Sequence, residues 1–181
     1  GHETSASLLS WALWCLAAAP DWGKAVAKEA QAFLAAPDFA NLSKMHVTRN
    51  VLRETLRLYP PVPMVVREAT RAEVFRKRPV RQGSQVVVSP WHLGRHEALW
   101  EAPDDFDPDR WDDGTPQREA WLPFSAGPRV CPGAGFALAE GAVLLAKLMA
   151  AFRFSATDTP VPVAHLTVRS RDGIKLDVAA R

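Results

Sequence analysis

The residues best suited to chemistry lie in the stretch FSAGPRVCPG, where one cysteine sits among turn-forming residues. Gly127 and Gly133 allow a tight backbone path and the close approach of a flat ligand. Cys131 comes just before a predicted long helix, whose positive end stabilises a thiolate. Arg129, two residues away, adds positive charge. The pattern therefore predicts a stabilised thiolate at Cys131.

A single thiolate limits the kinds of site that Cys131 can form. It cannot complete a structural zinc site, because no second cysteine or histidine pair has the required spacing. A catalytic nucleophile needs a histidine partner, and no nucleophile signature surrounds His92 or His96. A haem iron with an axial thiolate needs only one cysteine from the protein, which matches the single cysteine of this stretch. The other cysteine, Cys15, is typical of a buried small hydrophobe. A disulfide between Cys15 and Cys131 is an alternative, but the sequence shows no sign of a secreted context.

Two further groups of residues have chemically useful spacing. Glu54 and Arg57 in RETLRLYPP are three residues apart and share one face of a predicted helix. On their own, they are most simply a solvated ion pair. The first five residues, GHETS, place Glu3 beside Thr4, and an ordinary helix cap is an equal interpretation there.

The cysteine stretch resembles the F-x-x-G-x-R-x-C-x-G signature of the cytochrome P-450 family of haem-thiolate enzymes. It matches at every fixed position, namely Phe124, Gly127, Arg129, Cys131 and Gly133. The resemblance implies haem b (iron protoporphyrin IX) as the cofactor, bound by these residues. It also implies that Cys131 is the metal ligand, axial to the iron.

The pair Glu54 and Arg57 is similar to the E-x-x-R helix of the same family. Pro108-Asp109-Arg110-Trp111 is similar to its P-E-R-F motif. The resemblance implies a structural triad of Glu54, Arg57 and Arg110. Charge-assisted hydrogen bonds within it would fix the long loop behind the haem.

The start of the chain resembles the end of the family's A/G-G-x-D/E-T-T/S motif. A threonine hydroxyl can hydrogen-bond to a carbonyl one turn earlier and distort the helix, which leaves a groove for dioxygen and water. The resemblance implies that Glu3 and Thr4 are catalytic residues that relay protons to dioxygen.

The resemblance also assigns residues to the haem propionates and to the substrate. Arg67 and Arg129 match positions that hold propionates, since a guanidinium suits a carboxylate; a surface strand residue is the alternative for Arg67. The residues implied to line an apolar substrate are Val62, Met64, Val65 and His165. Core packing is the alternative for the three apolar residues, and solvation is the alternative for His165.

The elements that must position these residues follow from the hydrophobic pattern and from the resemblance. Asp21 is a predicted N-cap for a helix that runs to about Ala36, and Ser43 is a predicted N-cap for the E-x-x-R helix. Short β-branched runs over 62–88 predict a small antiparallel sheet. The named segments are an oxygen-activation helix over 1–19, the E-x-x-R helix over 43–58, a meander over 91–123, the cysteine loop over 124–133, a long proximal helix over 133–154 and a β-hairpin over 164–178.

The predicted fold class is mainly α with small antiparallel β-sheets (α+β). The chain has 181 residues, 48% of them hydrophobic, which suits one globular domain. The resemblance implies the C-terminal half of the cytochrome P-450 fold, with the N-terminal half of the haem-thiolate monooxygenase domain absent. The run 7–19 comes closest to a bilayer span but is too short, so we expect no membrane segment in this chain.

The implied function is a haem-dependent monooxygenase. It would insert one atom of O2 into an apolar small molecule, with electrons from NAD(P)H through a reductase or a ferredoxin- or flavodoxin-type donor. The alternatives are a truncated fragment without activity or stable haem binding, and a peroxygenase that uses hydrogen peroxide. A net charge of +2 is too small to indicate nucleic-acid binding, so we expect no nucleic-acid partner. A cytoplasmic location is favoured if the source is bacterial.

The densest positive charge in the sequence lies over residues 71–81. It comprises Arg71, Arg76, Lys77, Arg78 and Arg81. A solvated hairpin is the simplest interpretation, and a docking patch for an acidic redox partner is the alternative.

Overall fold

The computed structural model describes residues 1–112 and 119–181 of the chain. Its helices are α1 (His2–Ala18), α2 (Pro20–Ala35), α3 (His46–Leu58), α4 (Pro90–Leu93) and α5 (Ala134–Ala151), with 3₁₀ turns η1 (Phe39–Lys44), η2 (Pro108–Trp111) and η3 (Gly127–Arg129). Its strands are β1 (Val65–Glu68), β2 (Glu73–Phe75), β3 (Arg78–Val80), β4 (Gln85–Val88), β5 (Phe152–Ala156), β6 (Pro162–Ala164), β7 (Val168–Ser170) and β8 (Leu176–Ala180). All the described strands pair antiparallel in two-stranded sheets, so the predicted fold class is confirmed.

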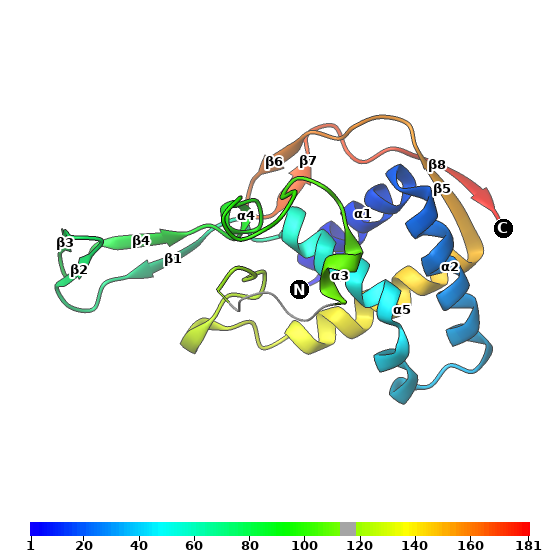
Figure 1. Cartoon of the computed structure of the whole chain (residues 1–181), viewed down its shortest axis with the longest axis horizontal. Helices are drawn as coiled ribbons and strands as arrows, with labels where there is room; N and C mark the ends of the chain where they lie inside the picture. The colour runs from blue at the N-terminus through cyan, green and yellow to red at the C-terminus, as the bar shows by residue number, and fades with distance from the viewer. Residues whose placement is uncertain (113–118) are drawn as a thin grey trace.

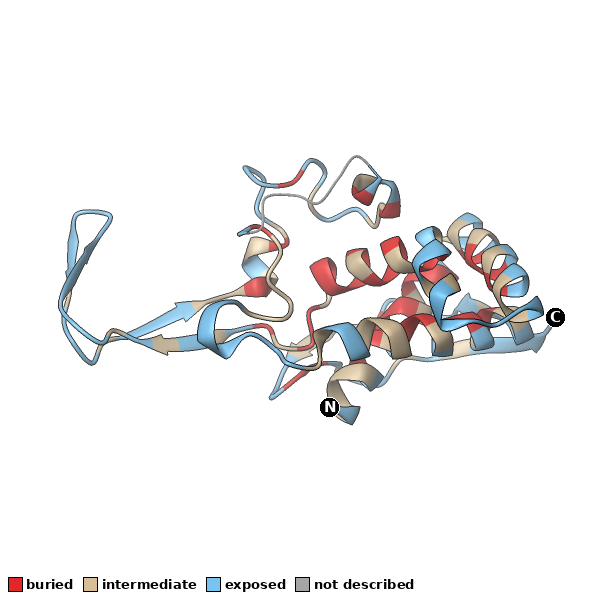
Figure 2. Cartoon of the chain, turned by 90° about the horizontal axis from the view of Figure 1, so that it is seen from below, coloured by how far each residue is buried: buried red, intermediate tan, exposed pale blue. Residues whose placement is uncertain are grey.

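The core lies where α1, α2, α3 and α5 pack against one another (Figure 1). Leu8 and Leu16 of α1 meet Val51 and Leu52 of α3, and Leu145 of α5 lies in the same buried cluster. In Figure 2 the buried positions follow the facing sides of these helices. This bundle therefore holds the start of α1 at a fixed place beside the start of α5.

The helix boundaries correct two sequence predictions. Pro20 is the first residue of α2, where proline suits a helix start, so Asp21 is not the N-cap. Ser43 does not cap α3 either, because its hydroxyl donates to the Ala40 carbonyl within η1. The first turn of α3 is instead capped by Glu29 of α2.

Glu29 reaches across from α2 to the backbone N–H groups in the first turn of α3. Its carboxylate accepts from the backbone N–H of Val47 (2.9 Å) and of Thr48 (2.8 Å) and from the Thr48 hydroxyl (2.6 Å). A negative charge at a helix start is also favoured by the helix dipole. Local sequence rules do not detect a cap that comes from eighteen residues away.

The end of the chain differs from its predicted pairing. The proximal helix ends at Ala151, not at 154, and the chain continues as β5, which pairs with β8. β7 pairs with β6. The predicted hairpin over 164–178 was therefore wrong, because its two runs pair with different strands. The prediction rested on the polar turn around Gly173. Gly173 does have a positive φ of +79°, but the strands on either side of it do not pair with each other.

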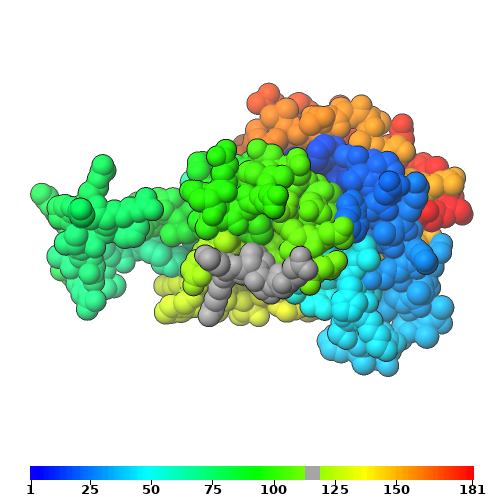
Figure 3. All heavy atoms as spheres, viewed as in Figure 1, coloured from blue at the N-terminus to red at the C-terminus, as the bar shows by residue number. Residues whose placement is uncertain are grey.

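The predicted sheet over 62–88 is confirmed as the pair β1 and β4, with Val65 opposite Val88. This pair extends into the shorter hairpin of β2 and β3. Together they form an arm that projects from the helical body (Figures 1 and 3). The predicted meander over 91–123 contains α4 at its start and η2. Residues 113–118 of the meander lie outside the described residues.

One described helix, α5, is long and apolar enough to cross a membrane by length and composition alone. The prediction that residues 7–19 come closest to a membrane span was therefore wrong. Here α5 packs through Ala142, Leu145 and Met149 into the helical core. Core helices of this composition satisfy the same criterion.

Candidate functional site

A pocket of about 400 Å³ lies between the start of α1, the segment before and within β1, the cysteine loop and the start of α5. Most of the side chains that line it are apolar. Its lining residues are Gly1, His2, Thr4, Ser5, Leu8, Leu56, Pro61, Val62, Val65, Pro123, Phe124, Ser125, Arg129, Cys131, Gly133, Phe136, Ala137 and Glu140. Three regions far apart in the sequence thus build one cavity, since the cysteine loop leads directly into α5; we call this cavity the cysteine pocket.

Cys131 lies in the wall of this pocket as a free, exposed thiol, whereas Cys15 is free and buried in α1. The backbone N–H of Cys131 donates to the Phe124 carbonyl (2.9 Å), which closes the loop. Gly127 has φ +71°, a conformation that favours glycine, and α5 begins three residues after Cys131. The loop therefore presents the sulfur toward the cavity near a helix start.

Burial raises the pKa of the Cys15 thiol, so Cys15 stays protonated at neutral pH. The two thiols differ in their surroundings as the sequence predicted. They form no disulfide.

Thr4 faces the cysteine pocket from α1, and its hydroxyl donates to the Gly1 carbonyl (2.9 Å). Glu3 directly precedes Thr4 in α1, and its side chain makes its contacts outside this pocket. Its carboxylate accepts from the Thr167 hydroxyl (2.8 Å) and from Arg169 of β7. The hydrogen bond from Arg169, followed by that from Thr167, lowers the pKa of Glu3. The structure thus brings Thr4, but not Glu3, to the same pocket as Cys131.

A contact that sequence reasoning missed links α1 to α5 across the pocket. The Ser5 hydroxyl donates to the Glu140 carboxylate (3.1 Å), and both residues line the cavity. The two residues are 135 positions apart. Nothing in the local pattern around either residue signals the contact.

The two predicted propionate-binding arginines lie near the cysteine loop. Arg129 lines the pocket and is exposed. Arg67 is half-buried, and its guanidinium donates to the Ser125 hydroxyl (2.7 Å) and to the Val66 carbonyl. Arg129 and Ser125 line the pocket, whereas Arg67 reaches it only through its hydrogen bond to Ser125.

The structure brings Glu54, Arg57 and Arg110 together. The Arg57 guanidinium donates to both Glu54 carboxylate oxygens (2.9 and 2.8 Å), and Arg110 Nε donates to Glu54 Oε1 (2.9 Å). Glu54 also accepts from the Asp107 backbone N–H and from Trp111 Nε1 (3.0 Å each). The Glu54 and Arg57 side chains are fully buried.

The same cluster holds the meander in place. The remaining N–H groups of Arg57 donate to the carbonyls of Gly94, Pro103 and Asp105. The guanidinium also lies 5.2 Å from the Trp100 ring. One buried cation therefore anchors a long irregular segment, which needs such partners for its backbone carbonyls.

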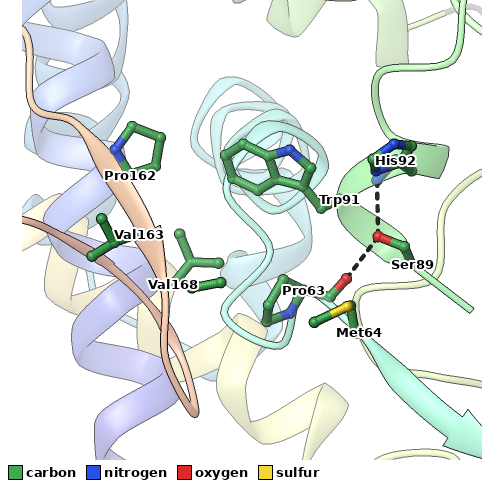
Figure 4. Close-up of a pocket in the computed structure, with 9 residues that line it drawn as sticks. Pro63, Met64, Ser89, Trp91, His92, Pro162, Val163 and Val168 are labelled. Atoms are coloured by element: carbon green, nitrogen blue, oxygen red, sulfur yellow. Dashed lines mark hydrogen bonds between the residues drawn. The ribbon is translucent and has the colours of Figure 1, made fainter. Parts of the chain in front are cut away.

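The predicted substrate-lining residues do not share one cavity. Val62 and Val65 line the cysteine pocket. Met64 lines a neighbouring apolar pocket of about 330 Å³, together with Pro63, Trp91 and Val163 (Figure 4). In that pocket the Ser89 hydroxyl donates to the Pro63 carbonyl (3.0 Å). His165 is exposed in the turn between β6 and β7.

The cysteine pocket fits a flat, largely apolar cofactor with one protein ligand to its metal. Within residues 1–112 and 119–181, no three His, Cys, Asp or Glu side chains converge as a metal site. A haem iron needs only one axial donor from this chain, and Cys131 Sγ lies in the pocket wall. Apolar Phe124, Val65 and Leu8 would contact the ring, and Arg129 suits a carboxylate at the rim.

Comparison with known proteins agrees with this geometry. The cytochrome P450 family model matches residues 1–177. The chain therefore belongs to the cytochrome P450 family, whose members are haem monooxygenases in general.

Several curated proteins are similar over nearly the whole chain. LUTEIN DEFICIENT 5, a chloroplastic protein of Arabidopsis thaliana, is 32% identical over 192 residues, which cover 100% of this chain and 32% of that protein. Cytochrome P450 4A10 of Mus musculus is 36% identical over 183 residues, or 97% of this chain and 36% of that protein. Cytochrome P450 4B1 of Homo sapiens is 34% identical over 185 residues, or 97% of this chain and 36% of that protein. The chain spans about a third of the length of these relatives.

Proposed function

We propose that this chain is the haem-binding and oxygen-activating part of a cytochrome P450 monooxygenase. The observation that carries the proposal is that Cys131 and Thr4, which are far apart in the sequence, line one pocket. A thiolate on one wall and a hydroxyl on another are the two groups that such chemistry needs from the protein.

The residues present would hold haem b through contacts of three kinds. The Cys131 thiolate would be the axial iron ligand. Phe124, Gly127 and Gly133 shape the loop that presents it, and Arg129 and Arg67 would pair with the propionates. When bound, haem supplies the redox chemistry that activates O2 and inserts one oxygen atom into an apolar substrate. Its electrons would come from NAD(P)H through a reductase or a ferredoxin- or flavodoxin-type donor.

Thr4 holds the proton-handling position in this proposal. Because its hydroxyl donates to the Gly1 carbonyl, the Thr4 oxygen is free to accept a hydrogen bond from a group in the pocket. Glu3 lies outside the pocket, paired with Arg169. It holds the start of α1 against β7. A proton from Glu3 reaches the pocket only when its carboxylate leaves Arg169.

A second candidate, a chain without turnover of its own, is favoured by the exposure of the pocket wall. Cys131 and Arg129 are exposed, and Phe136 is 71% exposed. An open site admits water and weakens electrostatic interactions around the reacting groups. We therefore expect no monooxygenase product from the 181-residue chain with haem, NADPH and a reductase. Measured product would overturn this expectation.

Retention of haem during gel filtration tests the binding part of the proposal. We expect haem to co-elute with the chain, and we expect Cys131→Ser to reduce this co-elution. Cys15→Ala is the matched control, because it removes the other thiol, which is buried outside the pocket. Equal haem retention in Cys131→Ser and the parent chain would reject Cys131 as the ligand.

A further inference from the structure

The hairpin of β2 and β3 is the most isolated part of the described chain. It lies at the end of the projecting arm, beyond the β1 and β4 pair (Figures 1 and 3). All three residues of β2 are exposed, and Figure 2 shows the tip exposed throughout. The hairpin contributes nothing to the cysteine pocket or to the core clusters.

The hairpin carries a strong positive charge. Residues 71–81 include five basic residues and one acidic residue, a net charge of +4. The acidic residue, Glu73, is already paired with Arg71 (2.5 Å). Arg76, Lys77, Arg78 and Arg81 are all exposed. The tip thus offers a concentrated set of cations to an anionic partner.

Large apolar side chains are exposed among these cations. Val74 is 72% exposed and Phe75 is 67% exposed. Phe75 lies opposite Arg78 in the register, and Val74 lies opposite Pro79. Because successive strand residues point to opposite faces, both faces of the hairpin carry apolar groups. This arrangement suits insertion of the tip better than docking of a single face.

The turn itself places two cations at its apex. Arg76 has φ +47° and Lys77 has φ +63°. Two successive residues with positive φ form the kind of turn in which Asn and Gly are preferred. Here two long cationic side chains occupy those positions, and the Arg76 guanidinium lies 6.0 Å from the Phe75 ring.

The size of the hairpin argues against a stable protein interface built on the hairpin alone. A stable protein interface takes about 20 to 30 residues from each side. The hairpin strands and turn span only residues 73–80. A lipid surface needs far less, since a few apolar side chains enter the headgroup boundary and each cation adds attraction to anionic lipids.

We propose that the β2–β3 hairpin docks the protein on an anionic lipid surface. Phe75 and Val74 enter the boundary between headgroups and acyl chains. The cations of residues 76–81 lie among the anionic headgroups. This inference is independent of the proposed haem chemistry, because the two sites share no residue.

Co-sedimentation with lipid vesicles tests the inference. We expect the chain to bind vesicles of phosphatidylcholine mixed with phosphatidylglycerol, and to bind pure phosphatidylcholine weakly. Each cation contributes about fivefold to partitioning at low salt, so the triple variant Arg76→Ser, Lys77→Ser, Arg78→Ser should bind about 100-fold more weakly. Added salt should likewise weaken the binding of the parent chain to the anionic vesicles. Phe75→Ser should lower the binding that persists at high salt.

The matched control removes three exposed lysines elsewhere, namely Lys24, Lys28 and Lys44, each replaced by serine. The control has the same net charge as the triple hairpin variant. It should bind at least tenfold more tightly than that variant. Equal binding by the two variants, or by the parent chain to both kinds of vesicle, would overturn the proposal. Capture of an acidic ferredoxin through the hairpin without vesicle binding would overturn it as well.

Discussion

At the residue scale, the buried Glu54 carboxylate links α3 to η2 and to the backbone just before η2. Glu54→Gln replaces one acceptor oxygen with an NH2 group that faces donors. Breaking a buried ion pair in this way costs about 3–5 kcal/mol. We expect the free energy of unfolding, measured in urea, to fall by that amount.

The exposed pair Asp21 and Lys24 is a control for Glu54. It has the same three-residue spacing on a helix, but both side chains are mostly solvated. Asp21→Asn should lower the unfolding midpoint only slightly, because an exposed ion pair and a solvated charge in the first turn of α2 both contribute little. Similar losses in the two variants would show that burial is not what makes the Glu54 cluster strong.

Glu3 provides a pH-dependent prediction. Hydrogen bonds from Arg169 and Thr167 hold its pKa below the ordinary value of 4.5 in the folded chain. Its stabilising contribution is therefore fully present above pH 4.5 and is lost as pH falls through the folded pKa. Glu3→Gln should lower stability at neutral pH and show a shallower loss below pH 4.5. Parallel acid-unfolding curves for Glu3→Gln and the parent chain would contradict this.

Motifs single out candidate residues where those residues lie within a short stretch of the sequence. The cysteine stretch and the Glu54 and Arg57 pair could be located because their members lie within a few positions. The contact between Ser5 and Glu140 could not be predicted, because helix packing brings together two residues that are 135 positions apart. The orientation of Glu3 depends likewise on β7, which only the fold places beside α1.

At the element scale, close approach of Gly94 to α3 fixes the start of the meander. A Cβ added at Gly94 would lie 2.3 Å from the Arg57 carbonyl oxygen, so the backbone would have to move. Gly94→Ala should therefore destabilise the chain by about 1–3 kcal/mol or more. Gly135→Ala, in open space within α5, should be neutral or slightly stabilising. Thermal unfolding of both variants checks this, and equal midpoints would contradict it.

The capping of α3 by Glu29 gives a second prediction for an element. Glu29→Ala leaves the buried Thr48 N–H and hydroxyl without their acceptor. We expect a loss of about 2 kcal/mol in urea unfolding. Glu29→Gln keeps one acceptor oxygen, so its free energy of unfolding should fall by less. If Glu29→Ala unfolds like the parent chain, the cap does not stabilise α3.

Most helices could be predicted at this scale, whereas strand partners could not. Periodicity and proline positions indicated α1, α2 and α3 to within a few residues. β7 and β8 were expected to pair with each other because a polar turn joins them. They pair instead with β6 and β5, since pairing is decided by packing around the whole body.

At the scale of the whole molecule, the four-helix core brings the start of α1 close to the cysteine loop and the start of α5. α1 and α5 belong to one buried cluster, which places Thr4 and Cys131 around a common cavity. The projecting arm lies outside this core (Figure 1). The cysteine pocket and the charged arm therefore lie in separate parts of the molecule.

The central claim is that Cys131 binds haem iron as a thiolate, and the absorption spectrum of the reduced, carbon monoxide-treated chain with haem tests it most directly. We predict a red-shifted, thiolate-type Soret band in the parent chain and in Cys15→Ala. The band should be absent in Cys131→Ser. Identical spectra for the parent chain and Cys131→Ser would contradict the claim.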